Sequence, residues 1–285
     1  MNQTDRFLTP NVCNWCTGCG NFGIWYSFKK AAEAENWSDG NTVIVAGIGC
    51  HGHIINFTKI TAFEGLHGRA IPVASGIKFA NHNLNVMVFT GDGDCLSEGG
   101  NHFIHAARRN QNITVILHDN AIYGLTTGQT SSRSSKGYVS KSTPDGKIEE
   151  PLNPMMLALS AGATFVARSY AGDIEHTAEL MARAAKHKGF ALLDILQPCV
   201  TFNHEYTHIF YQKNTYKLDN KYKTNNLYSA MEKCSEWGEK NIPVGVFYES
   251  DAPCYEDQLE VLKNETLVKR SVPKRDISKI FDKYC

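Results

Sequence analysis

The chain has 285 residues, of which 42% are hydrophobic and 20% charged, and its formal net charge is zero. This length suits one large α/β domain or two small ones, and the composition is that of a chain with an ordinary buried core. A neutral chain has no overall field that attracts nucleic acid or an anionic membrane. No apolar run approaches the roughly 20 residues that cross a bilayer, and residues 1–15 lack the layout of a signal peptide, so we expect a cytoplasmic protein.

Predicted strands and helices alternate over most of the chain. Apolar, β-branched runs predict strands, and apolar residues at helical spacing predict helices. The strands are expected over 42–47, 86–90, 113–117, 164–168 and 190–196, and the helices over 70–83, 100–110, 154–161 and 174–186. This alternation predicts the α/β class, with a mainly parallel sheet covered by helices on both faces.

A change in composition near residue 215 suggests a domain boundary. We expect residues 1–215 to form the main domain and 216–285 to form a C-terminal extension that packs on it or on a partner subunit. In the extension, 228–239 predicts a helix, 243–248 is short and apolar, and 259–269 is weakly helical. Its three cysteines, Cys234, Cys254 and Cys285, are expected to be free thiols.

Nine cysteines in a chain without a secretion signal indicate metal binding or redox chemistry rather than disulfides. Cys13, Cys16 and Cys19 stand three residues apart, and Cys50 and Cys199 stand singly beside turn residues. A zinc ribbon would need a second close pair, which the sequence lacks. One close pair and two remote thiolates can hold a [4Fe–4S] cluster. Spacing alone leaves structural or redox-active thiols as the alternative.

The segment 86–129 predicts a strand, a helix and a second strand. The first strand ends at Gly91-Asp92-Gly93-Asp94, and the second ends at Asp119-Asn120 before a glycine-rich turn. In open α/β sheets, ligands bind outside the carboxyl ends of the strands. The Asp92 carboxylate, the Asn120 amide oxygen and the Ile122 backbone carbonyl are hard oxygen ligands of the kind that Mg²⁺ prefers. Ordinary Asp-Gly turns are the alternative interpretation.

Taken together, these motifs resemble the β subunits of the 2-oxoacid:ferredoxin oxidoreductases. Gly-Asp-Gly with a later Asn and a backbone carbonyl two residues on is similar to the thiamine-diphosphate signature. The matching stretches stand in the family's order and cover about residues 12 to 215. They are 15–20, 47–50, 66–70, 91–94, 100–102, 119–126, 128–129 and 197–201.

The resemblance implies three bound groups. It implies a [4Fe–4S] cluster held by Cys16, Cys19, Cys50 and Cys199, with Cys13 outside the pattern. It also implies Mg²⁺ bound to Asp92, Asn120 and the Ile122 carbonyl. Around thiamine diphosphate it places Ile48, Gly49, Cys50, His51, His67, Gly93, Asp94, Gly124 and Leu125. From the residues alone, His67 could donate to a phosphate or make only structural hydrogen bonds.

The resemblance further implies oxidative decarboxylation of a 2-oxoacid to its acyl-CoA, with electrons passed to ferredoxin. The carboxylate that activates the cofactor is expected on an α subunit, so we expect a heteromer. Thr127 occupies a position that carries a lysine linked to substrate selection in some relatives. Threonine offers no charge to a second carboxylate, although the partner subunit could supply that charge. Because the compact chain looks most like 2-oxoglutarate-type or broad-range members, we expect an enzyme of that kind.

Two other classes of function stay open at this point. A non-oxidative thiamine-diphosphate-dependent 2-oxoacid decarboxylase would keep Asp92 and Asn120 but would not need the four cysteines. A non-enzymatic iron–sulfur or zinc-binding interaction protein would keep the cysteines and not bind thiamine diphosphate.

Two stretches outside the motifs also need an interpretation. Residues 130–153 are rich in Ser and turn residues, which predicts a loop over the cofactor, a subunit interface or a plain surface loop. His204-Glu205-Tyr206-Thr207-His208 matches the zinc-protease pattern H-E-x-x-H, with Glu232 as a possible third ligand. That pattern works only on a helix. The segment is rich in poor helix formers, and we expect no protease site there.

Overall fold

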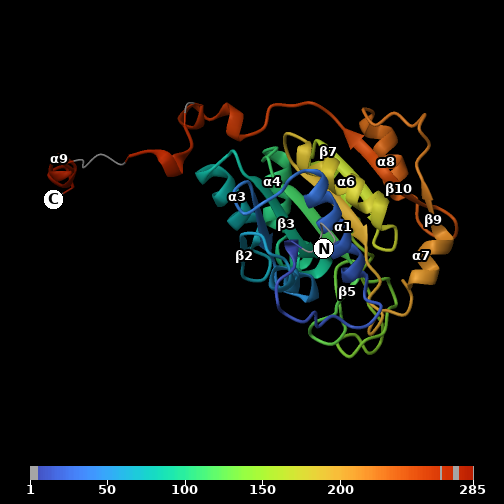
Figure 1. Ribbon diagram of the computed structural model, residues 1–285. Helices are drawn as coiled ribbons and strands as arrows, with labels where there is room; N and C mark the ends of the chain where they lie inside the picture. The colour runs from blue at the N-terminus through green and yellow to red at the C-terminus, as the bar shows by residue number, and fades with distance from the viewer. Residues whose placement is uncertain (1–5, 264, 272–275, 285) are drawn as a thin grey trace.

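The computed structural model describes residues 6–263, 265–271 and 276–284 of the chain. Within these residues, eight strands form one sheet in the order β2-β1-β3-β4-β8-β7-β10-β9. Figure 1 shows this sheet with several of its strands labelled. The strands are β1 (Thr42–Ala46), β2 (Ala62–Glu64), β3 (Asn85–Gly91), β4 (Thr114–Asp119), β7 (Phe165–Tyr170), β8 (Ala191–Leu196), β9 (Thr215–Lys217) and β10 (Ile242–Glu249). Neighbouring strands are parallel except for β10, which runs antiparallel to β7. The prediction of a mainly parallel sheet is confirmed.

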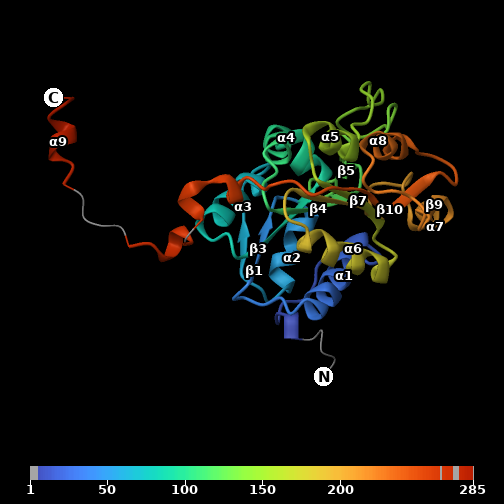
Figure 2. The ribbon, with the colours of Figure 1, turned by 90° about the horizontal axis from the view of Figure 1, so that it is seen from above.

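Helices cover both faces of this sheet (Figure 2). On one face lie α1 (Gly20–Ala34) and α6 (Ile174–Lys186), which pack against each other. The other face is covered by α3 (Ala70–Ala80), α4 (Gly100–Arg108), α5 (Pro154–Ala161) and α8 (Leu227–Ser235). The shorter helices are α2 (Ile54–Phe57), α7 (His208–Asn214) and α9 (Ser278–Phe281).

Alternating side chains of the central strands fill two separate apolar layers. In β3, Met87 and Phe89 pack on the side of α1 and α6, whereas Val86 and Val88 pack on the opposite side. All four side chains are buried, because this strand is covered on both faces. Strands buried in this way read as continuous apolar runs in the sequence.

The predicted elements agree with the structure at most positions. The helices over 154–161 and 174–186 have the predicted bounds. In α5 the Asn153 side chain accepts hydrogen bonds from the backbone N–H groups of Met155 and Met156, and Gly162 ends the helix in the left-handed conformation. The predicted helix over 70–83 ends earlier, at Ala80, where Asn81 turns extended.

The C-terminal extension departs more from its prediction. The helix expected over 228–239 ends at Ser235, because Glu236 is extended. The prediction of a weak helix over 259–269 is wrong. Leu259 and Thr266 are extended, and only short 3₁₀ turns form near them. The apolar run 243–248 becomes β10 and joins the main sheet, so part of the extension continues the fold of the preceding residues. A domain boundary at residue 215 stays a prediction.

The last described residues, including α9, lie apart from the α/β body in both ribbon views (Figures 1 and 2). Across the residues that the structure describes, no helix has both the length and the apolar character needed to cross a bilayer. Cys285 lies outside the described residues, whereas Cys234 and Cys254 are buried free thiols.

Candidate active site

Two adjoining cavities lie at the carboxyl ends of the central strands. The first, of about 210 Å³, is lined by Cys16, Cys19, Cys50 and Cys199. The second, of about 70 Å³, is lined by every residue that the sequence predicted around Mg²⁺ and thiamine diphosphate. These are Ile48, Gly49, Cys50, His51, His67, Asp92, Gly93, Asp94, Asn120, Ile122, Gly124 and Leu125. The cavities share four of their lining residues, namely Cys50, Asn120, Gly124 and Leu125.

The four cysteines reach the first cavity from three separate parts of the chain. Cys16 and Cys19 flank a tight turn, in which Gly18 has a φ of 81° and the Cys19 N–H donates to the Cys16 carbonyl at 2.9 Å. Cys50 follows the end of β1, and Cys199 follows the end of β8. Cys13 is not among the residues that line either cavity.

Gly124 lies between Cys50 and Cys199. A Cβ atom placed on this glycine would lie 3.6 Å from the Cys50 Sγ and 3.5 Å from the Cys199 Sγ. Both sulfurs therefore border the turn that also lines the second cavity. Burial, with the nearby cysteines adding to it, raises the pKa of Cys19 to about 12 and that of Cys50 to about 11.

The cysteines that line the first cavity have the number and type of donor groups that an iron–sulfur cluster takes. In the described part of the chain, no group of three or more His, Cys, Asp or Glu residues is arranged to hold a single metal ion. A [4Fe–4S] cluster takes four thiolates. Because each binds a different iron atom, the sulfurs can stand around a cavity rather than converge on one point. Four thiols around a partly apolar cavity of about 210 Å³ fit that arrangement.

Asp92 is the buried carboxylate of the second cavity. It is 1% exposed, and its Oδ1 accepts a hydrogen bond from the Asn120 N–H at 3.3 Å. Its Oδ2 accepts from the Ser131 hydroxyl. Burial, followed by the nearby Asp119 carboxylate, raises the pKa of Asp92 to about 7. No Lys or Arg among the described residues forms an ion pair with it.

The surroundings of Asp92 fit a divalent cation. A buried carboxylate without an ion-pair partner is costly, and a bound cation offsets that cost. Asn120 and Ile122 line the same cavity, and the Asn120 Oδ1 accepts from the Ile122 N–H at 3.0 Å. The residues present therefore match the hard oxygen ligands that Mg²⁺ takes.

Asp94 serves a different purpose from Asp92. Its carboxylate accepts from the Thr90 hydroxyl at 2.6 Å and the Gly68 N–H at 2.7 Å, and His67 Nδ1 lies 2.8 Å from it. Burial alone would raise the pKa of Asp94, but the contacts with His51, Thr90 and Gly68 hold it below its usual value. Asp94 thus joins the loops that carry His51 and His67, and its oxygens are occupied within the chain.

Gly47, at the end of β1, makes room for Asp94, because a Cβ there would overlap the Asp94 Oδ2. We expect Gly47→Ala to lower the free energy of unfolding by about 1–3 kcal/mol, the usual cost of overpacking. Urea denaturation of the purified chain measures this. Gly76→Ala in α3 is the matched control, because a Cβ there meets no atom within 4 Å. The control should gain up to about 1 kcal/mol in helix propensity. Equal stability of the two variants would contradict the packing argument.

Thr127 lies outside both cavities. It is exposed on the turn that follows Leu125, and its φ of 73° is unusual for a β-branched residue. Its side chain is therefore placed at the rim of the site.

Several supporting contacts of the site had no signal in the sequence. The loop 130–153 packs behind Asp92, where Ser131 contacts it and Arg133 forms a buried ion pair with Asp119 at 2.7 Å. Gln197 lines the thiol cavity and donates to the Cys19 Sγ at 3.4 Å. These contacts join residues far apart in the chain, which no local pattern reports.

The H-E-x-x-H segment lacks the helix that a zinc protease requires. Residues 204–207 are irregular, and α7 begins only at His208. His208 contacts the Tyr170 hydroxyl at 2.6 Å and the Gly18 carbonyl at 2.8 Å, and Glu205 accepts from Ser135 at 2.8 Å. Both side chains are thus used in structural contacts.

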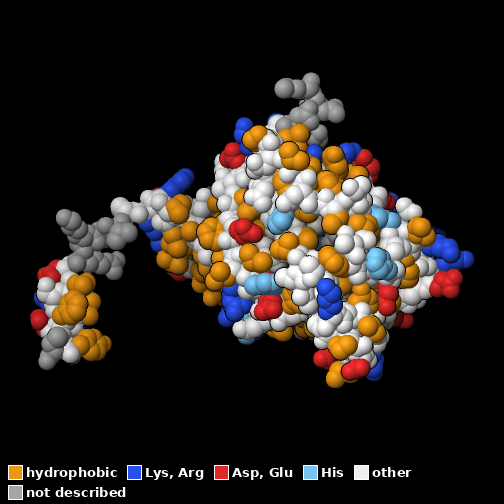
Figure 3. Space-filling model, turned by 90° about the horizontal axis from the view of Figure 1, so that it is seen from below, with side chains coloured by type: hydrophobic (Ala, Val, Ile, Leu, Met, Phe, Trp, Pro, Cys, Tyr) orange, Lys and Arg blue, Asp and Glu red, His pale blue; other side chains and the backbone are white. Residues whose placement is uncertain are grey.

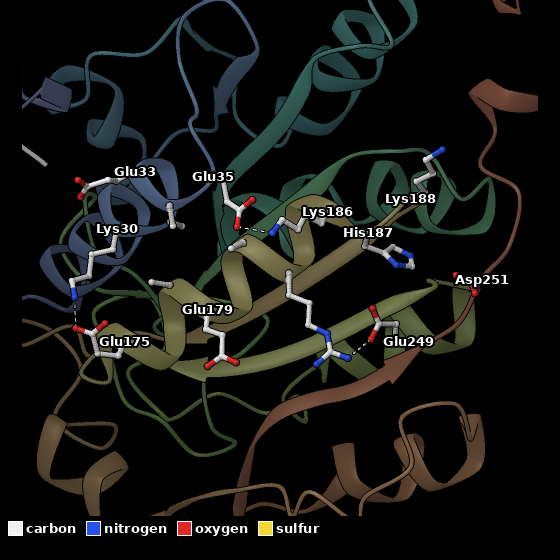
Figure 4. A pocket seen from close by; sticks show the side chains of 15 residues that line it. Lys30, Glu33, Glu35, Glu175, Glu179, Lys186, His187, Lys188, Glu249 and Asp251 are labelled. Atoms are coloured by element: carbon white, nitrogen blue, oxygen red, sulfur yellow. Dashed lines mark hydrogen bonds and ion pairs between the residues drawn. The ribbon is translucent and has the colours of Figure 1, made fainter. Parts of the chain in front are cut away.

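A larger cavity lies elsewhere, a groove of about 1080 Å³ between α1 and α6 (Figure 4). Its rim is charged, and much of that charge is paired within the chain: Lys186 lies 2.7 Å from Glu35, and Lys30 pairs with Glu175. It contains none of the predicted site residues. The volume of a cavity alone therefore does not identify the candidate active site.

Comparisons with known proteins agree with this geometry. The family model "Thiamine pyrophosphate enzyme, C-terminal TPP binding domain" matches residues 47–195. A second family model, for the C-terminal part of the pyruvate ferredoxin oxidoreductase β subunit, matches residues 199–264. Fold and site together define a thiamine-diphosphate-binding protein of the α/β class.

Comparison with individual relatives identifies the family within this class of proteins. The chain is 45% identical over 267 residues to the 2-oxoacid:ferredoxin oxidoreductase subunit beta of Sulfolobus sp, which covers 89% of this chain and 87% of the relative. It is 43% identical to the subunit of that name from Saccharolobus solfataricus, over 84% of this chain and 82% of the relative. The chain belongs to the β subunits of the 2-oxoacid:ferredoxin oxidoreductases.

A solved structure has the same fold over nearly the full chain. It is the 2-oxoglutarate:ferredoxin oxidoreductase from Magnetococcus marinus with 2-oxoglutarate, coenzyme A and succinyl-CoA bound. The TM-score is 0.89 at 36% identity, covering 99% of this chain and 96% of that one. Membership of the family and the thiamine-diphosphate-binding fold are thereby confirmed.

Proposed function

We propose that this chain supplies the thiamine diphosphate, Mg²⁺ and [4Fe–4S] sites for the CoA-dependent oxidative decarboxylation of a 2-oxoacid, with ferredoxin as electron acceptor. The observation that carries the proposal is the pair of adjoining cavities, one lined by thiols and one by oxygens, that share Cys50, Asn120, Gly124 and Leu125.

The residues of the two cavities have different proposed roles. When bound, thiamine diphosphate supplies an electron sink for the carbanion chemistry, and the cluster accepts electrons singly. Asp92, Asn120 and the Ile122 carbonyl would hold Mg²⁺ and so orient the diphosphate. Cys16, Cys19, Cys50 and Cys199 would hold the cluster. Asp94 keeps the loops of the second cavity in place through its contacts with His67 and Gly68.

The four-thiol cavity argues against the two alternatives. A non-oxidative decarboxylase has no use for thiols beside its cofactor. A metal-binding interaction protein has no use for the buried Asp92 and its oxygen neighbours. Because the two cavities share lining residues, groups bound in them would be neighbours.

The second cavity has features of a site that is incomplete without an α subunit. Its volume of about 70 Å³ is well below the 300–1,000 Å³ usual for small-molecule sites. Among its lining residues the carboxylates are Asp92 and Asp94, and both accept hydrogen bonds within the chain. A further carboxylate that activates the cofactor would come from the partner.

The surface around the cavities suits such a partner. On the face that Figure 3 shows, hydrophobic and histidine side chains are interspersed with charged groups. Leu125 and Val200, which line the thiol cavity, are 46% and 36% exposed, and the nearby turn residue Leu66 is 79% exposed. An interface with α would cover these side chains.

The test compares the chain alone with its complex with the α subunit. We expect CoA-dependent, ferredoxin-linked turnover only in the complex, together with stoichiometric iron and acid-labile sulfide. Rates with pyruvate, 2-oxoglutarate and 2-oxoisovalerate would define the substrate, for which we propose 2-oxoglutarate or a broad range of 2-oxoacids. Full turnover by the isolated chain, or a complex without iron, would refute the proposal.

A further inference from the structure

Gln197 connects the two cavities through one side chain. It follows β8, is 1% exposed and lines the thiol cavity. Its Nε2 donates to the Cys19 Sγ at 3.4 Å and to the Pro198 carbonyl at 3.0 Å. Its Oε1 accepts from the Asn120 Nδ2 at 2.9 Å. One amide therefore contacts a residue of the sulfur site and a residue of the oxygen site.

Backbone groups fix which way each amide points. The Pro198 carbonyl can only accept, so the Gln197 nitrogen must face it. The Ile122 N–H can only donate, so the Asn120 oxygen faces that group and its nitrogen faces Gln197. The orientation of both amides is thus determined by groups that have a single role.

The surrounding chain leaves space for this bridge. A Cβ placed on Gly20 would lie 2.8 Å from the Gln197 Cγ and 2.9 Å from the Pro198 Cδ. Glycine at the first position of α1 therefore lets the Gln197 side chain reach Cys19. At its other end, the Asn203 side chain donates to the Asn120 backbone carbonyl at 2.9 Å and steadies the same turn.

We infer that Gln197 is a positioning residue that acts on both centres: it donates a hydrogen bond to the Cys19 sulfur of the cluster and holds the Asn120 amide toward Mg²⁺. This inference rests on the proposed function. Hydrogen bonds to the sulfurs help to set the reduction potential of a cluster. Because reduction adds negative charge, the N–H favours the reduced form. Outer partners of metal ligands orient them, and their loss typically weakens metal affinity by 10- to 100-fold.

Two substitutions in the complex with the α subunit separate the two contacts. Gln197→Leu removes both. We expect its cluster to be about tenfold harder to reduce, which is about 59 mV for a one-electron couple. We also expect about 10-fold weaker Mg²⁺ binding in the presence of thiamine diphosphate. Gln197→Glu keeps an oxygen for the Asn120 Nδ2 but loses the donor to Cys19. We expect it to lower the potential and to leave Mg²⁺ binding within about threefold of wild type.

The readouts are a redox titration followed by electron paramagnetic resonance and a calorimetric Mg²⁺ titration. Gln111→Leu is the matched control. Gln111 is also buried, at 5% exposure, but it accepts a hydrogen bond from Ser75. It precedes the amino end of β4, whereas the cavities lie at the carboxyl ends of the strands. We expect the control to change neither quantity. If Gln197→Leu does not assemble, the Gln197→Glu complex decides.

The outcomes distinguish this inference from the function on which it rests. A Gln197→Leu complex with wild-type potential and Mg²⁺ affinity would overturn the inference and leave the proposed function intact. A change in both quantities in Gln111→Leu as well would also overturn it, since the effect would then not belong to the bridge. A wild-type complex without iron and sulfide would instead refute the proposed function.

Discussion

Cys199→Ala is expected to abolish the cluster and to leave thiamine diphosphate binding nearly unchanged. Cys199 lines only the thiol cavity, whereas Cys50 lines both cavities, so Cys199 is the cleaner probe. Loss of a direct ligand should exceed the roughly 10- to 100-fold effect of losing an outer partner. We expect ferredoxin-linked turnover of the complex to fall more than about 100-fold and iron and acid-labile sulfide to fall to background.

Cys13→Ala is the control for this substitution. Cys13 stands three residues before Cys16 but lines neither cavity, so its removal should leave the iron content at the wild-type level. Iron and sulfide assays, with calorimetric titration of thiamine diphosphate and Mg²⁺, measure both variants. Loss of iron in Cys13→Ala together with full iron in Cys199→Ala would show that the ligand set is wrong.

The central strands of the sheet were predictable because each one is a short run of neighbouring apolar residues. Strands such as β3 and β4 are covered on both faces, so they read as short, continuous apolar runs. Asp92 and Asn120 directly follow such runs. Because neighbouring parallel strands end at one edge of the sheet, the sequence also indicated that these side chains meet.

α1 escaped prediction for a physical reason. It begins without a side-chain cap and contains Gly23, which weakens a helix in isolation. A Cβ on Gly23 would overlap the Ala171 carbonyl, so close packing against the loop after β7 requires glycine there. The helix is therefore stabilised by tertiary contacts with α6, which the local sequence does not report.

The supporting contacts of the site were out of reach for a similar reason. Ser131 and Asp92 are 39 positions apart, and Gln197 and Cys19 are 178 apart. Their approach depends on the order of the strands and on the path of the loop 130–153. A motif search finds the groups that bind, whereas the groups that hold them in place become visible only in the fold.

Asp92→Asn is expected to weaken Mg²⁺ binding without lowering the stability of the cofactor-free chain. The substitution removes the anionic oxygen from the proposed Mg²⁺ site. We therefore expect the affinity for Mg²⁺ with thiamine diphosphate to fall more than about 100-fold, beyond the loss typical of an outer partner. Asparagine keeps the shape of the side chain and an oxygen for the Asn120 N–H. The Ser131 hydroxyl, which donates to the other Asp92 oxygen, can turn and accept from the asparagine NH₂ group. Because burial raises the pKa of Asp92, the charged carboxylate is costly there, and the cofactor-free variant should be as stable as wild type or more stable.

Asp94→Asn makes the matched comparison, because it is the same change two positions along the chain. The Asp94 carboxylate accepts from Thr90 and Gly68 and contacts His67. Contacts with His51, Thr90 and Gly68 hold its pKa below the usual value, so removing its charge loses stabilising interactions. We expect it to lower the free energy of unfolding by about 1–3 kcal/mol. Urea denaturation of the cofactor-free chains should thus give effects of opposite sign or clearly different size. If Asp92→Asn were destabilised as much as Asp94→Asn, or bound Mg²⁺ normally, Asp92 would be a structural residue rather than a ligand.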